Sequence, residues 1–340
     1  MIILCPKAVA LGLFDRGIES EEKTVIDVVA LGEVLIDFTS KGVDAQGYPT
    51  LEAHPGGAPA NFLAALGKFG AKTVLMGKVG NDAFGKLLLS TLEKAGIGTQ
   101  GMVVDDNVFT TMAFVTLDEK GDRTFSFARK PGADTQLCFE ELDLSLIEAC
   151  KVFHFGTLSL TDEPARTATC KAVAYAKEMG KLVSFDPNLR KPLWKDLEDA
   201  RMQMLWGLQQ ADVVKISDEE VEFLFGMDPV QGAAHILENY EAALVFVTCG
   251  ADGCYFSNGK AKGHVPGLQG LQVVDTTGAG DIFGGSALWK MLGLGVAPQN
   301  LTEVQLRDIV SFACTSASLS TTLPGGISSV HPLEEVLRRM

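Results

Sequence analysis

The sequence predicts an α/β fold in which a central, mostly parallel sheet is covered by helices on both faces. From residue 151 onward, short apolar runs rich in β-branched residues alternate with amphipathic helical stretches, as in successive βαβ crossovers. A period-2 pattern at 111–128 interrupts this alternation and predicts a smaller sheet outside the main one. A glycine-rich turn at 275–281 leads into an apolar helix and predicts a ligand site.

Composition and charge limit what the chain can bind. Its 340 residues carry a formal net charge of −14, which would repel nucleic acid or an anionic membrane, so we expect neither as a partner. Seven scattered cysteines without metal-ligand spacing favour reduced thiols and a cytosolic location. Residues 1–24 mix short apolar runs with charges, which predicts an N-terminal extension ahead of one main domain at 25–335.

The N-terminal part of that domain is expected to contain two strand and helix pairs. Residues 25–38 read as one strand, with Asp37 at its carboxyl end, where α/β sheets contact ligands. A helix is expected to start at the Gly-Gly-Ala-Pro-Ala-Asn segment 56–61 and to end near residue 70. A strand at 73–79 and a helix at 83–94 follow.

Two segments are expected to lie outside the main sheet. Residues 40–55 are rich in turn formers and predict a flap. The runs 111–117 and 123–128 alternate around the polar segment 118–122, which predicts a hairpin. We expect these segments, at about 38–55 and 101–130, to form a small β lid that closes over a small ligand and excludes water.

The C-terminal half reads as alternating strands and helices. The apolar runs predict strands at 152–156, 182–186, 213–216 and 244–248. Helical periodicity predicts helices at 164–179, 198–210, 218–225, a further helix ending at 240, and helices at 281–292, 303–320 and 333–339.

The turn at 275–281 has the sequence Asp-Thr-Thr-Gly-Ala-Gly-Asp. The N–H groups at a helix start lack intrahelical partners, and small residues let a charged ligand approach the main chain closely. Asp281 is placed where its carboxylate could face the same point. An anion site beside a carboxylate suggests phosphoryl transfer onto a hydroxyl, and a plain capped helix start is the structural alternative.

Two segments, taken in this order, resemble the signatures of a known family. Residues 56–61 with 77–85 resemble the first signature of the ribokinase-like (PfkB) carbohydrate kinases, and 275–286 resembles the second. Weaker matches extend the likeness over about residues 25–335. The resemblance implies a ribokinase-like fold and ATP-dependent phosphorylation of a primary sugar hydroxyl. The wording of 56–61 and 185–190 is similar to that of fructose kinases, and 2-keto-3-deoxygluconate and ribose are the alternative substrates.

The resemblance also implies catalytic and sugar-binding residues. Asp281 would be the general base, and the N–H groups of Gly278, Ala279 and Gly280 would bind the charge on the transferred phosphoryl group. The sugar hydroxyls would be held by Asp37, Gly57 and Asn61, with Arg129 and Arg190 as further candidates. Arg129 has a solvated surface charge as its alternative reading, unless the lid closes over it.

On the nucleotide side, the segment 215–220 resembles the family's Asn-x-x-Glu element, which organises Mg²⁺ and the phosphates of ATP through water. Ser217 stands where the family has Asn, so Glu220 carries more of this prediction, and Ser217 with Glu220 also reads as a capping box. Further residues implied to bind the nucleotide are Lys215, Thr248, Gly250 and Gly253.

The family often uses a monovalent cation, here expected to be K⁺, beside the anion site. Asp275 and Thr277 match its first ligands, and the remaining candidates are Ser320, Leu323, Gly325 and Ser329. Exposed lid strands in such folds often pair between subunits, so a homodimer through the lid is expected. A sensor that binds sugar or nucleotide without turnover is the alternative function, and an intact 278–281 segment disfavours it.

Overall fold

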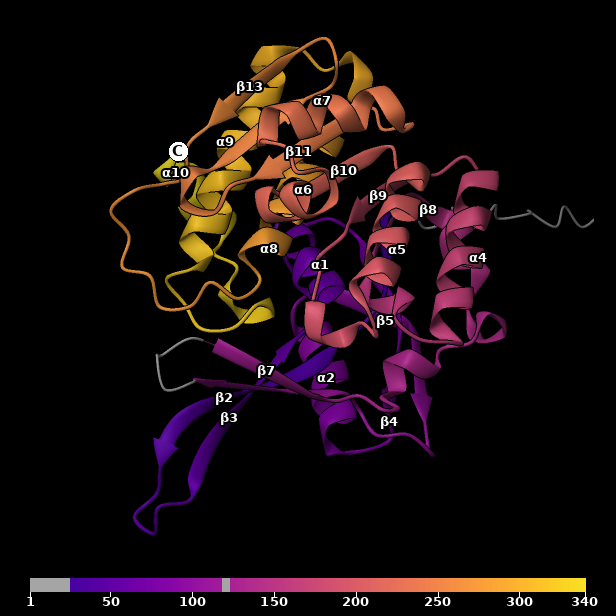
Figure 1. Ribbon diagram of the computed structural model, residues 1–340, viewed down its shortest axis with the longest axis vertical. Helices are drawn as coiled ribbons and strands as arrows, with labels where there is room; N and C mark the ends of the chain where they lie inside the picture. The colour runs from indigo at the N-terminus through magenta and orange to yellow at the C-terminus, as the bar shows by residue number, and fades with distance from the viewer. Residues whose placement is uncertain (1–24, 118–122) are drawn as a thin grey trace, which may run out of the picture.

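The computed structural model describes residues 25–117 and 123–340 (Figure 1). Within these residues, nine strands form one large sheet. The strands in spatial order are β13 (Lys262–Val265), β12 (Cys254–Ser257), β11 (Leu244–Thr248), β10 (Val213–Ser217), β9 (Leu182–Asp186), β8 (Cys150–Gly156), β1 (Ile26–Leu31), β4 (Thr73–Gly80) and β5 (Ile97–Asp105). Every neighbouring pair from β11 to β5 is parallel, whereas β12 runs antiparallel to β11 and β13 antiparallel to β12.

Helices cover both faces of this sheet, which confirms the predicted layers. Buried side chains of α1 (Ala58–Lys68), α2 (Ala83–Lys94), α8 (Ala279–Leu294), α9 (Glu303–Ser320) and α10 (Leu333–Arg339) belong to one hydrophobic cluster. The other cluster contains buried side chains of α3 (Leu144–Ala149), α4 (Ala165–Glu178), α5 (Leu197–Gln210), α6 (Asp218–Phe225) and α7 (Pro229–Asn239). The 3-10 helices are η1 (Ala133–Gln136), η2 (Phe139–Glu141), η3 (Leu158–Leu160), η4 (Lys191–Leu193), η5 (Gly250–Asp252), η6 (Pro298–Asn300) and η7 (Ile327–Ser329).

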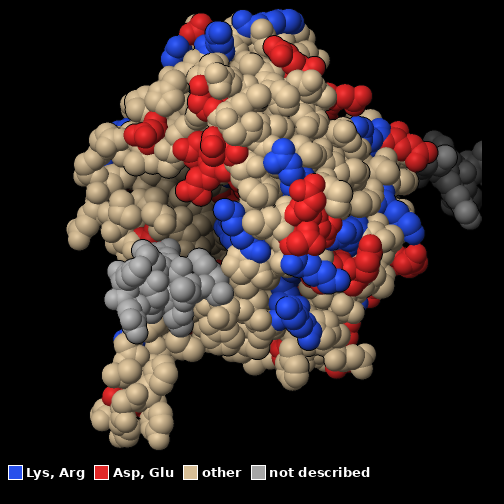
Figure 2. Space-filling model, in the orientation of Figure 1, with Lys and Arg blue, Asp and Glu red and all other residues tan. Residues whose placement is uncertain are grey.

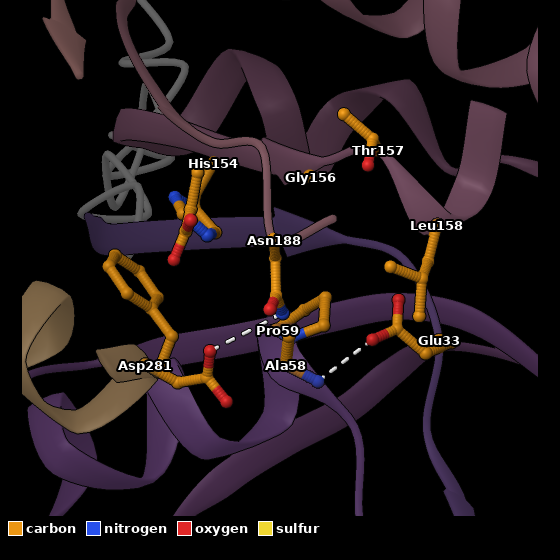
Figure 3. A pocket seen from close by; sticks show the side chains of 11 residues that line it. Glu33, Ala58, Pro59, His154, Gly156, Thr157, Leu158, Asn188 and Asp281 are labelled. Carbon is orange, nitrogen blue, oxygen red and sulfur yellow. Dashed lines mark hydrogen bonds between the residues drawn. The ribbon is translucent and has the colours of Figure 1, made fainter. Parts of the chain in front are cut away.

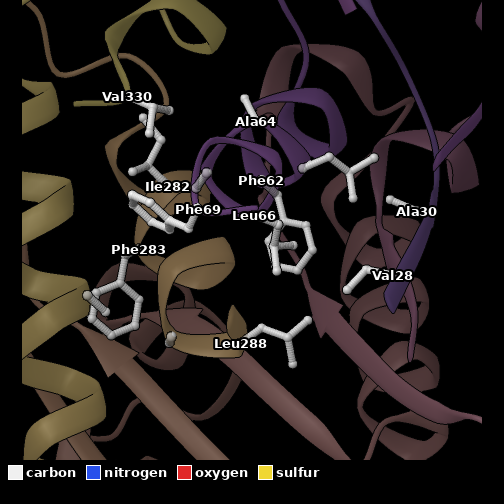
Figure 4. Packing of buried hydrophobic residues seen from close by; sticks show 14 of the residues in the cluster. Val28, Ala30, Phe62, Ala64, Leu66, Phe69, Ile282, Phe283, Leu288 and Val330 are labelled. Atoms are coloured by element: carbon white, nitrogen blue, oxygen red, sulfur yellow. The ribbon is translucent and has the colours of Figure 1, made fainter. Parts of the chain in front are cut away.

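The contact between α1 and α8 is the part of the core that matters most for the site. Phe62 and Leu66 of α1 pack in the same cluster as Ile282 and Leu288 of α8 (Figure 4). Burial of each such side chain stabilises the fold by roughly 1.5–3 kcal/mol. The first turn of α8 is therefore fixed against the first turn of α1.

A second sheet projects from the large one (Figure 1), as the sequence predicts. Its strand order is β3 (Pro49–Gly56), β2 (Leu35–Val43), β6 (Met112–Leu117) and β7 (Arg123–Ala128). Strands β6 and β7 pair antiparallel, which confirms the hairpin, and the turn at 118–122 lies outside the described residues. The flap at 40–55 is the antiparallel pair of β2 and β3.

The predicted single strand at 25–38 is wrong. The chain leaves the large sheet after Leu31 and enters the small sheet at Leu35. The start of α1 packs against the break between the two strands. A β-carbon at Gly32 would lie only 2.6 Å from Pro59 Cγ. Asp37 is therefore a residue of the small sheet and not the end of a core strand.

The predicted lid boundary at residue 101 is also wrong, because β5 pairs in parallel with β4 over 97–105 and belongs to the large sheet. Strands β12 and β13 were missed, since each has only four residues and β13 alternates between exposed and half-buried positions. Among residues 25–117 and 123–340, no helix is long and apolar enough to cross a membrane.

Candidate active site

The first turn of α8 follows a left-handed residue. Gly278 has φ 76°, a value that favours glycine, and it is the N-cap of α8. A β-carbon at Gly278 would lie 3.0 Å from Asn61 Nδ2, and one at Gly326 would lie 2.1 Å from Asn61 Oδ1. The Asn61 amide is therefore packed between the start of α8 and a second loop. Only residues without a side chain leave room for it there.

Asp281 lies in this first turn and is buried, with 6% of its surface exposed. Its Oδ2 accepts a hydrogen bond of 2.9 Å from Asn61 Nδ2. Its Oδ1 accepts one of 3.5 Å from Asn188 Nδ2 (Figure 3). Burial raises the pKa of Asp281, and the Lys215 ammonium and the Asn61 hydrogen bond partly offset this rise. A carboxylate held in this way binds a proton more readily than an exposed aspartate does.

A cleft of about 580 Å³ reaches the first turn of α8. Figure 2 shows the surface hollowed beside the small sheet, with acidic and basic side chains at the edge of the hollow. Ala279 and Gly280 form part of its wall, as do Arg190 and Phe283. All five residues predicted to bind the nucleotide also line this cleft, namely Lys215, Glu220, Thr248, Gly250 and Gly253.

Lys215 of β10 forms a buried ion pair with Asp186 of β9, with 3.0 Å between Nζ and Oδ2. Burial disfavours the charged ammonium, but the carboxylates of Asp186, Glu220 and Asp281 outweigh this effect and raise the pKa of Lys215. Lys215 Nζ lies 3.0 Å from the point that a β-carbon at Gly280 would occupy. The cation is thus held against the first turn of α8.

Glu220 and Ser217 form a capping box at the start of α6, so the structural alternative for this pair is confirmed. Ser217 Oγ accepts from Glu220 N at 3.2 Å, and Glu220 Oε2 accepts from Ser217 N at 2.9 Å. Glu220 Oε1 also accepts from Leu189 N at 2.7 Å. This carboxylate therefore ties the loop after β9 to the cleft wall.

The predicted sugar residues come from three parts of the fold. Asp37 lies on β2 and its Oδ2 would be 2.5 Å from a β-carbon at Gly56. Burial raises the pKa of Asp37 to about 6, with Arg190 lowering it and Asp281 raising it. Gly57 is the N-cap of α1, with φ 121°, and a β-carbon there would be 2.5 Å from the Glu33 carbonyl oxygen. Asp37 therefore interacts electrostatically with Arg190 and Asp281, although both are distant from it in sequence.

Arg129 is not a solvated charge, which corrects that expectation. It is 5% exposed and pairs with Asp134, with 2.7 Å between Nη2 and Oδ2. Its Nη1 donates to Thr161 Oγ1 at 2.7 Å and its Nη2 donates to the Leu158 carbonyl at 2.8 Å. The guanidinium is therefore bound by protein groups, and this geometry does not support the predicted contact with substrate.

The residues proposed for the cation lie on two segments that meet. Asp275 Oδ1 accepts from Thr277 N at 3.0 Å, and Asp275 Oδ2 accepts from Gly325 N at 3.0 Å. Ser320 and Ser329 are buried, and their hydroxyls donate to the carbonyls of Ala317 and Gly326. Leu323 is 38% exposed. Oxygen atoms that suit a hard cation are thus present, and the ligand set stays a prediction.

Three further polar residues lie near Asp281, and the sequence assigns none of them a role of its own. Glu33 is 3% exposed, lies at the break between β1 and β2, and accepts a 2.8 Å hydrogen bond from Ala58 N (Figure 3). Burial raises its pKa to about 7. His154 stacks on Phe62 at 3.7 Å, and burial lowers its pKa to about 3, so it is neutral. Asn188 has a φ of 47° and lies in the 185–190 segment. The resemblance of this segment to fructose kinases is the sequence feature that could have indicated Asn188.

These features define a class of protein. A cleft large enough for a nucleotide ends at the glycine-rich start of α8. The buried carboxylate of Asp281 lies in this first turn, and the ammonium of Lys215 lies close to it. Phosphoryl transfer requires this combination of positioning, positive charge and a base. The fold and the site are those of a small-molecule kinase.

Comparison with known proteins gives the family. The profile of the pfkB family carbohydrate kinase matches residues 25–332, so the chain belongs to this family. It is 41% identical over 313 residues to fructokinase-2 of Solanum lycopersicum, covering 91% of this chain and 94% of that protein. The crystal structure of a fructokinase from Xylella fastidiosa with bound ATP has a TM-score of 0.81 and 31% identity, covering 92% of this chain and 97% of that one.

A further solved structure is a fructokinase double mutant from Vibrio cholerae O395 in a form with bound fructose, ADP and potassium ion. It has a TM-score of 0.80 and 30% identity, and the match covers 92% of this chain and 98% of that one. These neighbours confirm the ribokinase-like fold. The chain is an ATP-dependent carbohydrate kinase.

Proposed function

We propose that this kinase phosphorylates the primary hydroxyl of D-fructose to give fructose 6-phosphate. The observation that carries the catalytic part is Asp281, which is buried in the first turn of α8 and oriented by Asn61. Support for the sugar comes from the fructokinases among its relatives and from the segment 185–190. The buried pair of Arg129 and Asp134 favours a neutral sugar over 2-keto-3-deoxygluconate, because it removes one cation that could bind an acid.

In this reaction Asp281 accepts the proton of the sugar hydroxyl as the oxygen attacks the γ-phosphorus of ATP. The new O–P bond forms, the bond from phosphorus to the ADP oxygen breaks, and the proton remains on the carboxylate until it is released to water. The N–H groups of Gly278 and Gly280 stabilise the charge on the transferred group, together with that of Ala279 once it leaves its 3.3 Å hydrogen bond to the Thr276 carbonyl. The helix dipole adds to their effect. The raised pKa of Asp281 suits this role as base.

The ligands are assigned to the site as follows. ATP lies in the cleft with its phosphates at the start of α8, and Lys215, Thr248, Gly250 and Gly253 line its path. Mg²⁺ would neutralise phosphate charge when bound, with Glu220 organising its waters, since Mg²⁺ usually retains several waters. The sugar lies next to Asp281 and contacts Asp37, Gly57, Asn61 and Arg190. K⁺ would be held by Asp275, Thr277, Ser320, Leu323, Gly325 and Ser329.

The small sheet is assigned the role of a lid over the sugar. It carries Asp37, and its strands β3 and β7 are at its edges. Val43, Tyr48 and Leu51 of the β2 and β3 hairpin are exposed at 67%, 69% and 43%. An apolar edge of this kind suits pairing with a second subunit, which supports a homodimer through the lid. A cytosolic location fits the free cysteines of the described residues.

A coupled ADP-release assay tests this function with fructose, ribose, tagatose, 2-keto-3-deoxygluconate and nucleosides, with Mg²⁺ and with or without K⁺. We expect turnover on fructose. Asp281→Asn should lower kcat by about 10²–10⁴-fold and keep fructose binding, because the amide keeps the shape of the site but cannot act as a base. Asp308→Asn, which removes an exposed partner of Lys290, is the matched control. Wild-type rates in Asp281→Asn would contradict the assignment, and no turnover on any sugar would favour a sensor.

A further inference from the structure

A small cavity lies beside Asp281 and shares Asn188 with the wall of the nucleotide cleft. Glu33, His154, Asp186, Asn188 and Asp281 are among the residues that line it (Figure 3). Its volume of about 10 Å³ leaves room for about one water molecule. The polar groups around it are therefore in an environment where charges act on each other strongly.

Asp186 differs from the other polar groups of this cavity in how its two oxygens are used. It is 6% exposed, and Oδ2 pairs with Lys215 Nζ at 3.0 Å. Its Oδ1 is buried and has no hydrogen-bond partner among the described residues. A buried carboxylate oxygen without a partner lowers stability, so Asp186 is better explained by a role in the site than by a contribution to the fold.

The ammonium of Lys215 is placed by this ion pair. Its Nζ lies 3.0 Å from the β-carbon position of Gly280, one residue before Asp281. A flexible four-carbon side chain would otherwise have several rotamers available in the cleft. Asp186 selects the one in which the cation lies at the first turn of α8.

We propose that Asp186 is a positioning residue for phosphoryl transfer: it holds the Lys215 ammonium against the first turn of α8 and balances its charge, so that Asp281 remains basic enough to accept the sugar proton. This inference rests on the proposed function, because it assigns Asp186 a role within that reaction. It does not require Asp186 to touch sugar or nucleotide.

The charges that face Asp186 come from every element around it. Burial raises the pKa of Asp186 to about 7; the Lys215 ammonium on β10 lowers this pKa, whereas the carboxylates of Glu220 on α6 and Asp281 on α8 raise it further. His154 of β8 contributes no charge, because burial keeps it neutral. Removal of the Asp186 charge therefore leaves the Lys215 cation unbalanced beside Asp281, and the pKa of Asp281 should fall.

Two variants with opposite signs test the proposal. Activity needs ionised Asp281, so the rate is lost as the pH falls through its pKa, and this loss is the acid limb of the kcat profile. In Asp186→Asn the acid limb should move to lower pH by about one unit, and kcat should fall at least about tenfold because Lys215 is no longer held. In Lys215→Met the acid limb should move to higher pH, because the cation that lowers the pKa of Asp281 is gone.

The control is Asp212→Asn. Asp212 is also partly buried with a raised pKa, but it accepts from Val183 N, at the start of β9 and away from the site. The acid limb of the Asp212→Asn variant should match that of the wild type. Asp186→Glu should retain part of the kcat that Asp186→Asn loses. Turnover of fructose with an unmoved acid limb in Asp186→Asn overturns the positioning role alone, whereas no turnover by the wild type overturns the proposed function. If Asp186→Asn does not fold, an unmoved acid limb in Lys215→Met overturns the proposal.

Discussion

Replacing Glu33 with glutamine should make the chain more stable relative to the wild type at pH 8 than it does at pH 5. Glu33 is fully buried at the break between β1 and β2, and burial raises its pKa from 4.5 to about 7. The folded state therefore holds a proton that the unfolded state releases between these two pH values. By linkage, stability falls as the pH rises through this window.

The magnitude follows from the size of the shift. A rise in pKa from 4.5 to about 7 corresponds to about 3 kcal/mol of unfolding free energy lost between pH 4.5 and pH 7 or above. Glutamine has no such titration, and its carbonyl oxygen can still accept the hydrogen bond from Ala58 N. The difference in stability between Glu33→Gln and the wild type should therefore shift by about 2.5 kcal/mol in favour of the variant from pH 5 to pH 8, because part of the loss has already occurred at pH 5.

Urea unfolding, followed by tryptophan fluorescence at half-unit steps from pH 5 to pH 8, measures this difference. The wild type supplies the reference at each pH, so other titrating groups cancel. Glu93→Gln, which removes a carboxylate at an exposed position of α2, is the control. A constant difference for Glu33→Gln across the whole range would refute the reasoning, because it would mean that Glu33 titrates alike in both states.

Two further substitutions test the site. Arg129→Met should lower the unfolding free energy by about 3–5 kcal/mol, because it leaves the buried Asp134 carboxylate without its partner, and urea unfolding should show the loss with little change in the fructose KM. A changed KM with unaltered stability would instead indicate a contact with substrate. Gly278→Ala should destabilise by about 1–2 kcal/mol through its left-handed backbone and should also lower kcat, since its β-carbon would meet Asn61. Gly295→Ala, which is also left-handed but has open space around it, should lower the melting temperature and leave kcat unchanged; equal kcat values in the two variants would contradict this.

Local patterns predicted most of the elements and the turn at the start of α8. The helix at 83–94 agrees with the prediction because Asp82 caps it and its apolar positions recur at helical spacing. The break after Leu31 could not be predicted, because the residue packed against it at Gly32 is Pro59, which is distant in sequence. The burial of Arg129 could not be predicted either, because two of its hydrogen-bond partners, Leu158 and Thr161, are about 30 residues away in the sequence.

The site residues divide along the same line. Residue type and spacing indicated Asp281 and the cleft wall, because turns and capping boxes are local structures. The roles of Glu33 and Asp186 depend on burial, which single residues in a sequence do not reveal. In the sequence Asp186 is only one residue of the 185–190 segment, whereas its ion-pair partner Lys215 comes from the neighbouring strand.

The packing of Asn61 between two glycines has an evolutionary consequence. A side chain at Gly278 or Gly326 would collide with the Asn61 amide, so neither glycine can change first without moving the group that orients Asp281. A smaller residue at position 61 would free the space at Gly326, whereas a β-carbon at Gly278 would still lie 3.0 Å from the Cα of Gly326. Positions 61 and 326 are therefore epistatic: we expect their substitutions to be tolerated when residue 61 changes first and harmful when residue 326 changes first.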